Sequence, residues 1–236
     1  LNFGNPERPE IMAQLVEAIE GMSEACGFFD TPITGGNVSL YNETLSEAIY
    51  PTPVLGIVGL LPGAAPVGIN FRRADREILL LGGLGQTDAT RFGSTQYAKT
   101  VVRALWGLPP ALDMDYEKRV HQAIRAIHAE GLAESAHDLS DGGLAVALAE
   151  CCGSLGAQIE LAAQGPLEHL LFHEAPSRIL LSTAGAERVG AIARDHGVEC
   201  LRLGSTAPDQ LRISVNGQPV IQLPLSDLVF DIAGLL

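Results

Sequence analysis

Short apolar runs of the β type alternate with helix-type stretches along most of the chain, and this alternation is what most constrains the fold. The strand candidates are EILLLGG (77–83), AQIELA (157–162), SRILLSTA (177–184), VECLRLGS (198–205), LRISVNG (211–217) and PVIQLP (219–224). Asn216 and Gly217 separate the last two, a pair typical of a two-residue hairpin. Because hairpins are mixed with the βα alternation, we predict an α/β (α+β) fold with a mixed sheet.

Helical spacing of apolar residues marks the stretches between these strands. Ile11, Leu15 and Ile19 recur on one side of a predicted helix of about 15 to 20 residues. Tyr116 and Val120 belong to a second helix, which we expect to end before the glycine at 131. Further helices are expected at 95–105, after the glycines at 142–143, between the strands at 177–184 and 198–205, and at 226–236, and TPVLGIVGLLP (52–62) is expected to be a strand buried on both faces.

Composition excludes several classes of protein. The 236 residues are 47% hydrophobic and carry a net charge of −13, so we expect a globular protein that binds neither nucleic acid nor anionic membranes. The sequence has no apolar run near the length that spans a bilayer. Cys26, Cys151, Cys152 and Cys200 form no C-x-x-C pair, and buried free thiols in a reducing cytoplasm fit this spacing best.

The first of three glycine-bearing stretches runs from Gly35 to Glu43. Paired glycines allow the backbone to approach a ligand closely. In an extended conformation, Asn37, Ser39 and Tyr41 would share one face and present three hydrogen-bonding groups. This face is either a plain solvent-facing surface or the wall of a binding site.

The second stretch, HDLSDGG (137–143), places two aspartates and two glycines at the start of a predicted helix. A helix N-terminus offers free N–H groups to an anion, and carboxylates beside such an anion require a metal ion between them. The stretch is therefore either a metal–phosphate site, with Asp138 and Asp141 as metal ligands and Gly142 and Gly143 at the phosphate, or only a helix cap by Asp138 or Ser140. The third stretch, Gly93–Ser94, precedes another predicted helix and could hold a phosphate in the same way.

Four blocks, in this order and spacing, carry a resemblance to a known family. They are LNFGNPERPEIMAQLVEAIEGM (1–22), TPITGGNVSLYNE (31–43), YPTPVLGIVGLL (50–61) and SAHDLSDGGLAVALAE (135–150). Together they resemble the C-terminal third of the synthetase subunits of phosphoribosylformylglycinamidine synthases, within the aminoimidazole ribonucleotide synthetase superfamily. The resemblance covers nearly the whole chain and is far more specific than any single motif.

The resemblance implies a reaction and its participants. An enzyme of this family uses ATP and Mg²⁺ to phosphorylate the formamide oxygen of formylglycinamide ribonucleotide, and ammonia from a glutaminase then displaces the phosphate. It implies cytoplasmic location and three partners: the N-terminal half of the same synthetase, a glutaminase subunit or domain, and a small accessory subunit.

The resemblance also implies a domain division and residue roles. The expected domains are the end of a second N-domain (1–68) and a complete second C-domain (69–236). Asn2, Gly35, Gly36, Asn37, Ser39, Tyr41 and Asn42 are then expected to contact the phosphorylated substrate. Gly93, Ser94, Gly142 and Gly143 are expected at a nucleotide or phosphate, and Asp138 and Asp141 at the metal.

Two alternatives to a substrate-binding role stay open. This half of the synthetase could be a scaffold that binds nucleotide only structurally, or the chain could belong to another superfamily member, such as a selenophosphate synthetase-like enzyme. Because the family's catalytic His and most ATP and Mg²⁺ ligands lie in the other half, we expect the chain alone to be inactive. We also expect it to self-associate through apolar surface at 53–61.

Overall fold

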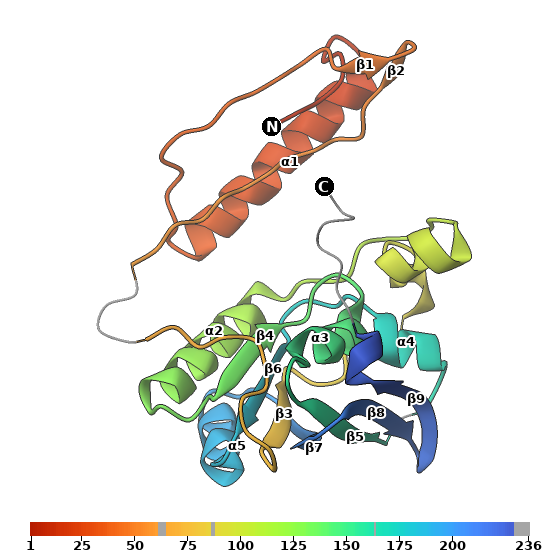
Figure 1. The fold of residues 1–236 in the computed structure, drawn as a ribbon. Helices are drawn as coiled ribbons and strands as arrows, with labels where there is room; N and C mark the ends of the chain where they lie inside the picture. Colours follow the sequence, from red (N-terminus) through yellow and green to blue (C-terminus); the bar gives the residue numbers. More distant parts are fainter. Residues whose placement is uncertain (61–64, 86–87, 163, 229–236) are drawn as a thin grey trace. The chain divides into compact units, whose positions relative to one another are not determined.

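The chain divides into two compact units, Leu1–Pro62 and Gly63–Leu236. The structure, a computed structural model, describes residues 1–60, 65–85, 88–162 and 164–228 (Figure 1). The division lies a few residues before the boundary at 68/69 that the sequence suggested.

The first unit consists of one long helix and a small hairpin. Helix α1 (Pro9–Phe28) begins with a proline, which suits the first turn because the missing N–H needs no partner there. Strands β1 (Glu43–Thr44) and β2 (Glu47–Ala48) pair antiparallel. The predicted amphipathic helix is confirmed, but Ile11 is its only buried residue among those described.

The predicted buried strand at 52–62 is wrong over the part that the structure describes. Residues 51–60 form no named strand and are exposed, and Val58 and Leu60 are each 97% exposed. Thr52 alone pairs with another backbone segment, as an isolated bridge to Asn2. An apolar run becomes a buried strand only when neighbouring strands and a covering layer are present. Residues 61 and 62 lie outside the described part.

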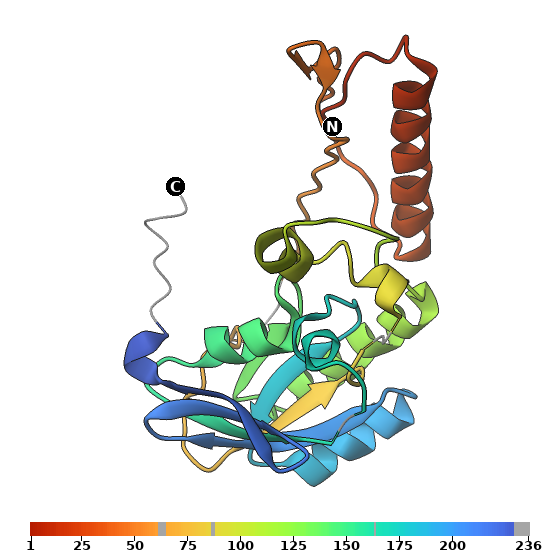
Figure 2. The ribbon, with the colours of Figure 1, turned by 90° about the vertical axis from the view of Figure 1, so that its right-hand side faces the viewer.

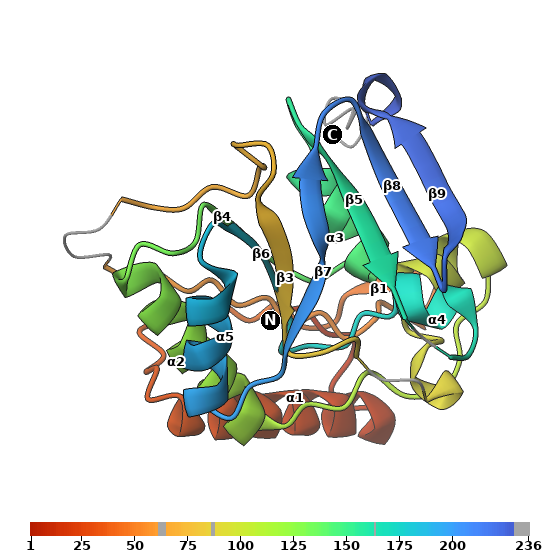
Figure 3. The ribbon, with the colours of Figure 1, turned by 90° about the horizontal axis from the view of Figure 1, so that it is seen from below.

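The second unit is built on a seven-stranded mixed sheet with the strand order β4-β6-β3-β7-β5-β8-β9 (Figure 3). Only β5 and β8 pair in parallel, and the other neighbours are antiparallel. This confirms the predicted mixed sheet. The strands are β3 (Glu77–Leu81), β4 (Ser135–Asp138), β5 (Gly156–Leu161), β6 (Ile179–Thr183), β7 (Cys200–Ala207), β8 (Gln210–Val215) and β9 (Gln218–Pro224).

Strand β3 is buried on both faces and separates two apolar clusters. Ile78 and Leu80 belong to the cluster that includes residues of helix α3 (Gly143–Cys151) and of helix α4 (Leu167–Phe172). Leu79 and Leu81 point the other way, toward α2 (Met114–Ala129) and α5 (Ala186–Asp195). Alternation of side chains along a strand thus explains why EILLL is apolar at every position after its first residue. Figure 3 shows α3 and α4 behind the strands and α5 beside α2.

The hairpin of β8 and β9 forms one edge of the sheet (Figure 2). Its turn contains Asn216 with φ of 51° and Gly217 with φ of 78°, the left-handed conformations that a two-residue hairpin needs. The predicted hairpin is confirmed. Leu211, Ile213 and Val215 of β8 are buried on the α3 side.

One predicted helix differs from the structure, one helix was not predicted, and one prediction lies mostly outside the described residues. Helix α4 was not foreseen, because LEHLLF is too short to show helical periodicity. The predicted helix at 95–105 is a shorter π-helix, η2 (Ala98–Val102), which ends where Arg103 takes φ of 60°. Of the predicted helix at 226–236, the structure describes only the 3₁₀ turn η3 (Leu225–Asp227), since 229–236 lie outside the described part. No described helix combines the length and apolar character needed to cross a membrane.

All four cysteines are free, as expected, but only Cys151 and Cys152 are buried, whereas Cys26 and Cys200 are half-buried. Burial raises the pKa of the Cys151 and Cys152 thiols to about 12. Thiolate is therefore scarce at neutral pH at both positions, and the two residues act as small apolar groups of the core.

Helix α3 begins at a pair of glycines in the left-handed backbone conformation, which residues with a side chain adopt only at a cost in energy. Gly142 has φ of 77° and Gly143 has φ of 64°. A Cβ on Gly143 would lie 2.5 Å from the carbonyl oxygen of His173, so the backbone of the 172–173 segment packs directly on this glycine. Gly131, after α2, has a similar φ of 68°, but a Cβ there would meet nothing within 4 Å.

Replacing these two glycines separates backbone strain from backbone contact. Gly131→Ala adds only left-handed strain, and we expect it to lower the free energy of unfolding by about 1 kcal/mol. Gly143→Ala adds the same strain and a collision with backbone, and we expect a loss of about 3 kcal/mol. Urea unfolding followed by the fluorescence of Trp106, the single tryptophan, measures both. Equal losses would contradict the packing described for Gly143.

Candidate functional site

A polar row crosses three backbone segments of the first unit. Asn2 forms a parallel bridge with Ser39 and an antiparallel bridge with Thr52. The Asn2 N–H donates to the Thr52 carbonyl at 3.0 Å, and the Thr52 N–H donates back to Asn2 at 3.0 Å. Side chains of directly paired residues lie on the same face, so these three form one row, and all three residues are exposed.

Asn42 extends this row and orients the hydroxyl of Ser39. Its Nδ2 donates to the carbonyl of Phe3 at 3.0 Å, which leaves Oδ1 as an acceptor. Ser39 Oγ donates to that Oδ1 at 3.1 Å. The serine oxygen therefore keeps its lone pairs for an incoming donor. Because the hydroxyl donates to an amide oxygen and not to a base, the arrangement suits binding and not nucleophilic attack.

The remaining candidates in the first unit are not aligned as predicted. The predicted common face of Asn37, Ser39 and Tyr41 is wrong, because Tyr41 has φ of 60° and ends the extended run. Its hydroxyl donates to Glu7 at 3.3 Å, beside the start of α1. Gly35 and Gly36 are exposed, and a Cβ on either would meet nothing within 4 Å, so this backbone is open on both sides.

In the second unit, a carboxylate that the sequence analysis did not select joins two candidate stretches. Oε1 of Glu174 accepts the backbone N–H of Gly142 at 2.8 Å and the backbone N–H of Gln96 at 2.8 Å. Neither Asp138 nor Ser140 caps α3 with its side chain, so the cap interpretation in that form is wrong. Helix N-termini favour a nearby anion, and at the start of α3 this anion is the carboxylate of Glu174 and not a bound ligand.

The Gly93–Ser94 loop is held by a tryptophan. A Cβ on Gly93 would lie 2.2 Å from the carbonyl oxygen of Trp106, and the Trp106 N–H donates to the Gly93 carbonyl at 3.2 Å. Gly93 is therefore buried against Trp106, while Ser94 is exposed. The hydroxyl of Thr95 accepts the Ala98 N–H at 3.2 Å and so begins the helical turn.

The two aspartates predicted as metal ligands have protein partners. Asp138 Oδ1 lies 3.4 Å from Nδ1 of His137, and Asp141 Oδ2 accepts from Nε2 of Gln96 at 3.4 Å. Within the described ranges, no three His, Cys, Asp or Glu side chains are grouped to hold a metal ion. The pair does not make a cation site from protein groups alone.

The turn between α4 and β6 fixes Glu174 in place. Arg178 is 2% exposed, and its guanidinium donates to the carbonyls of His173 at 2.6 Å, Ala175 at 2.9 Å and Leu84 at 3.4 Å. Burial lowers the pKa of Arg178 to about 10, so it stays charged at neutral pH. Burial also lowers the pKa of the fully buried His173 to about 4, so its imidazole is neutral.

Neither Glu174 nor Thr52 is marked by a pattern in the sequence. Glu174 stands 32 residues from Gly142 and 78 from Gln96. A single glutamate in HEAPSR has no spacing that relates it to either. Thr52 was assigned to a buried strand, and only its bridge to Asn2 brings it into the polar row.

Comparison with known proteins gives both units the same relatives. Residues 1–61 match the N-terminal domain of AIR synthase related proteins, and residues 73–216 match the C-terminal domain. The phosphoribosylformylglycinamidine synthase subunit PurL of Moorella thermoacetica is 47% identical over 233 residues. The match covers 97% of this chain and 31% of that protein, so the chain spans about a third of the curated relatives it matches.

Solved structures agree with this comparison. T. maritima PurL complexed with FGAR aligns with a TM-score of 0.59 and 25% identity, over 69% of this chain and 29% of that chain. T. maritima PurL complexed with ATP shares the fold, with a TM-score of 0.67 and 22% identity over 89% of this chain and 34% of that one. The chain belongs to the AIR synthase related protein family and is similar to its PurL members over both units.

Proposed function

We propose that the chain is part of the synthetase subunit of a phosphoribosylformylglycinamidine synthase, an ATP-dependent C–N ligase of purine biosynthesis. The observation that carries this proposal is the 47% identity to a PurL subunit over 97% of the chain. Because the chain spans 31% of that relative, the complete enzyme includes further chain, and the residues here supply only part of the site.

The polar row of the first unit is the part proposed to contact formylglycinamide ribonucleotide. Asn2, Ser39 and Asn42 present exposed or half-buried donors and acceptors on neighbouring backbone segments. Gly35 and Gly36 leave room for a phosphate to approach the backbone. Asn37 and Tyr41 are exposed beside the row and complete the proposed substrate contacts.

ATP and Mg²⁺ are the proposed cofactors of the complete enzyme. A bound Mg²⁺ would screen the negative charge of the triphosphate. Mg²⁺ in such enzymes is usually held by one or two carboxylates together with phosphates and water. Asp138 and Asp141 suit that role only with a nucleotide and water as further ligands. We also propose that a bound nucleotide would place its phosphates at Gly93, Ser94, Gly142 and Gly143.

The proposed partners follow from the length of the relatives and from exposed apolar surface. We propose that the missing N-terminal half covers the exposed segment 51–60, in which Ile57 is 79% exposed. Without that half, the same segment is proposed to cause self-association. We also propose a glutaminase and a small accessory subunit as further partners and the cytoplasm as the location. The solved structure of PurLQS from Thermotoga maritima is in keeping with an assembly of more than one kind of subunit.

A scaffold role for the second unit is a second candidate, and Glu174 favours it. The carboxylate occupies N–H donors of Gly142 and Gln96 that would otherwise face a phosphate. With Glu174 as the acceptor, the second unit holds these loops together without a nucleotide. The two proposed roles then belong to different units: the first unit binds substrate, and the second unit stabilises the fold.

Ser39 tests substrate binding in the full-length synthetase. Ser39→Ala removes one oriented hydroxyl, and we expect it to weaken the affinity for formylglycinamide ribonucleotide about fivefold to tenfold. Ser23→Ala, on the exposed side of α1, is the matched control and should leave the affinity unchanged. Isothermal titration measures both. If Ser39→Ala binds normally but melts at a lower temperature, the row is structural and the binding role fails.

Glu174 tests the scaffold role in the 236-residue chain. Glu174→Ala leaves the N–H groups of Gly142 and Gln96 without their acceptor, and we expect it to lower the free energy of unfolding by about 3 kcal/mol. Added formate should restore part of this loss, because a small carboxylate fits the vacated position. Glu168→Ala, at an exposed glutamate of α4, should neither destabilise comparably nor respond to formate. Equal stability of the two variants would refute the role.

A further inference from the structure

Thr52 lies at one end of the polar row and is not among the substrate contacts proposed above. Its hydroxyl donates to the carbonyl of Tyr50 at 2.8 Å. Because a carbonyl oxygen only accepts, the proton of Thr52 is committed to the protein and the lone pairs of Oγ1 stay available. Ser39, at the other end, is arranged in the same way, since its proton is committed to Oδ1 of Asn42 at 3.1 Å. Each end of the row therefore offers an acceptor and no donor.

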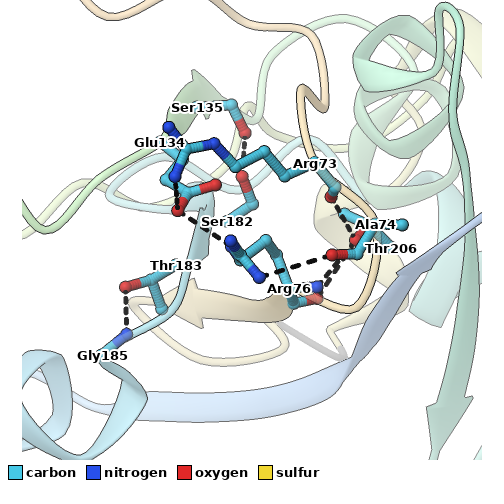
Figure 4. A network of polar contacts seen from close by, with 9 residues as sticks. All are labelled: Arg73, Ala74, Arg76, Glu134, Ser135, Ser182, Thr183, Gly185 and Thr206. Carbon is cyan, nitrogen blue, oxygen red and sulfur yellow. Dashed lines mark hydrogen bonds and ion pairs between the residues drawn. The ribbon is translucent and has the colours of Figure 1, made fainter.

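A threonine of the second unit shows how such a hydroxyl can be fully satisfied by the protein (Figure 4). Oγ1 of Thr206 donates to the carbonyl of Arg73 at 2.8 Å and also accepts the backbone N–H of Arg76 at 2.9 Å. Thr52 makes only the donating bond within the described part of the chain, and it is exposed. Its accepting capacity is left for water or for a ligand.

Asn2 stands between the two hydroxyls and completes the row. Its side-chain amide, which carries a donor and an acceptor, has no hydrogen-bond partner among the residues that the structure describes. Its backbone is held on both sides: it pairs with Thr52, and the N–H of the next residue, the fully buried Phe3, donates to the Ser39 carbonyl at 3.0 Å. A row fixed in this way loses little conformational freedom when a ligand binds.

The spacing of the row sets the size of a matching ligand. Neighbouring paired segments lie about 4.8 Å apart, so the hydroxyls of Ser39 and Thr52 are roughly 10 Å apart. A single phosphate group is too small to reach both. The matching ligand is extended, with an N–H or O–H group toward each end and a polar group between them.

The charge of the first unit also disfavours a phosphate on the row. Residues 1–60 contain eight carboxylate side chains and a single cationic side chain, that of Arg8. Arg8 is already paired, because its NH2 lies 3.2 Å from Oε1 of Glu43. A phosphate dianion on the row would therefore meet an acceptor at each end and no unpaired side-chain cation.

We propose that Ser39 and Thr52 accept hydrogen bonds from two N–H or O–H groups at opposite ends of the uncharged part of the substrate. Formylglycinamide ribonucleotide carries amide N–H groups and ribose hydroxyls in that part, and its phosphate then lies off the row. The inference rests on the proposed ligase function. It adds Thr52 to the substrate contacts and assigns the row to the donors of the substrate.

Calorimetric titration of the full-length synthetase tests the role of Thr52. We expect Thr52→Val to weaken the affinity for formylglycinamide ribonucleotide about fivefold, the effect of losing one hydrogen-bond acceptor. Thr52→Ser keeps the hydroxyl and should stay within about twofold of the wild type. Thr44→Val makes the matched change at an exposed position of β1 and should leave the affinity unchanged.

Substrate analogues identify the donors. The 2′-deoxy, 3′-deoxy and N-methylated forms keep the phosphate and lack one donor each. For one of them, the wild type should lose about fivefold in affinity, and Thr52→Val should cause no further loss because the donor is already missing. Ser39→Ala should show this pattern with a different analogue, since one donor cannot reach both hydroxyls.

The outcomes separate this inference from the proposed function. If the wild-type synthetase does not bind formylglycinamide ribonucleotide, the proposed function fails and the inference fails with it. If the substrate binds, three results would each overturn only the role of Thr52: no effect of Thr52→Val, an equal loss with Thr52→Ser, or a Thr52→Val loss that is the same for the substrate and every analogue. The same analogue for both variants would overturn the extended arrangement of the ligand.

Discussion

The buried guanidinium of Arg178 organises the end of the sheet on which the second unit depends. Its hydrogen bonds to the carbonyls of His173, Ala175 and Leu84 hold the turn after α4 against the loop after β3. A charged group at this depth is tolerated because backbone oxygens satisfy its donors. The turn it fixes carries Glu174, which in turn joins the start of α3 to the 92–98 loop. A single buried cation is therefore linked, through this turn and Glu174, to the start of α3 and to the backbone of Gln96.

The two units use similar sequence features in opposite ways. Gly142 and Gly143 lie in left-handed conformations under close backbone contact, and their N-terminal donors are engaged by the protein itself. Gly35 and Gly36 are open and exposed, next to a row of oriented polar groups. Glycine pairs that look alike in sequence thus serve packing in one unit and accessibility in the other. The proposed division of labour, with substrate at the first unit and support from the second, rests on this contrast.

Local pattern was sufficient for most of the second unit and for helix α1 of the first, but not for the apolar run at 52–62. Every predicted strand from 157 to 224 is present, because side-chain alternation and the Asn216–Gly217 turn are encoded within a few residues. The run at 52–62 has the same apolar character, yet its described part is exposed, because burial depends on neighbours that the local pattern does not contain. Glu174 was missed for the same reason: the segments that it joins are distant in sequence.

The two margins of the sheet limit what the second unit can pair with. At one margin, the carbonyl of Gly68 already accepts the N–H of Ala136 in β4. At the other, β9 carries Pro219 and Pro224, each of which removes a backbone donor from the outermost strand. Proline on an outer strand obstructs the addition of a further strand. The addition of further strands is therefore discouraged at both margins of this sheet.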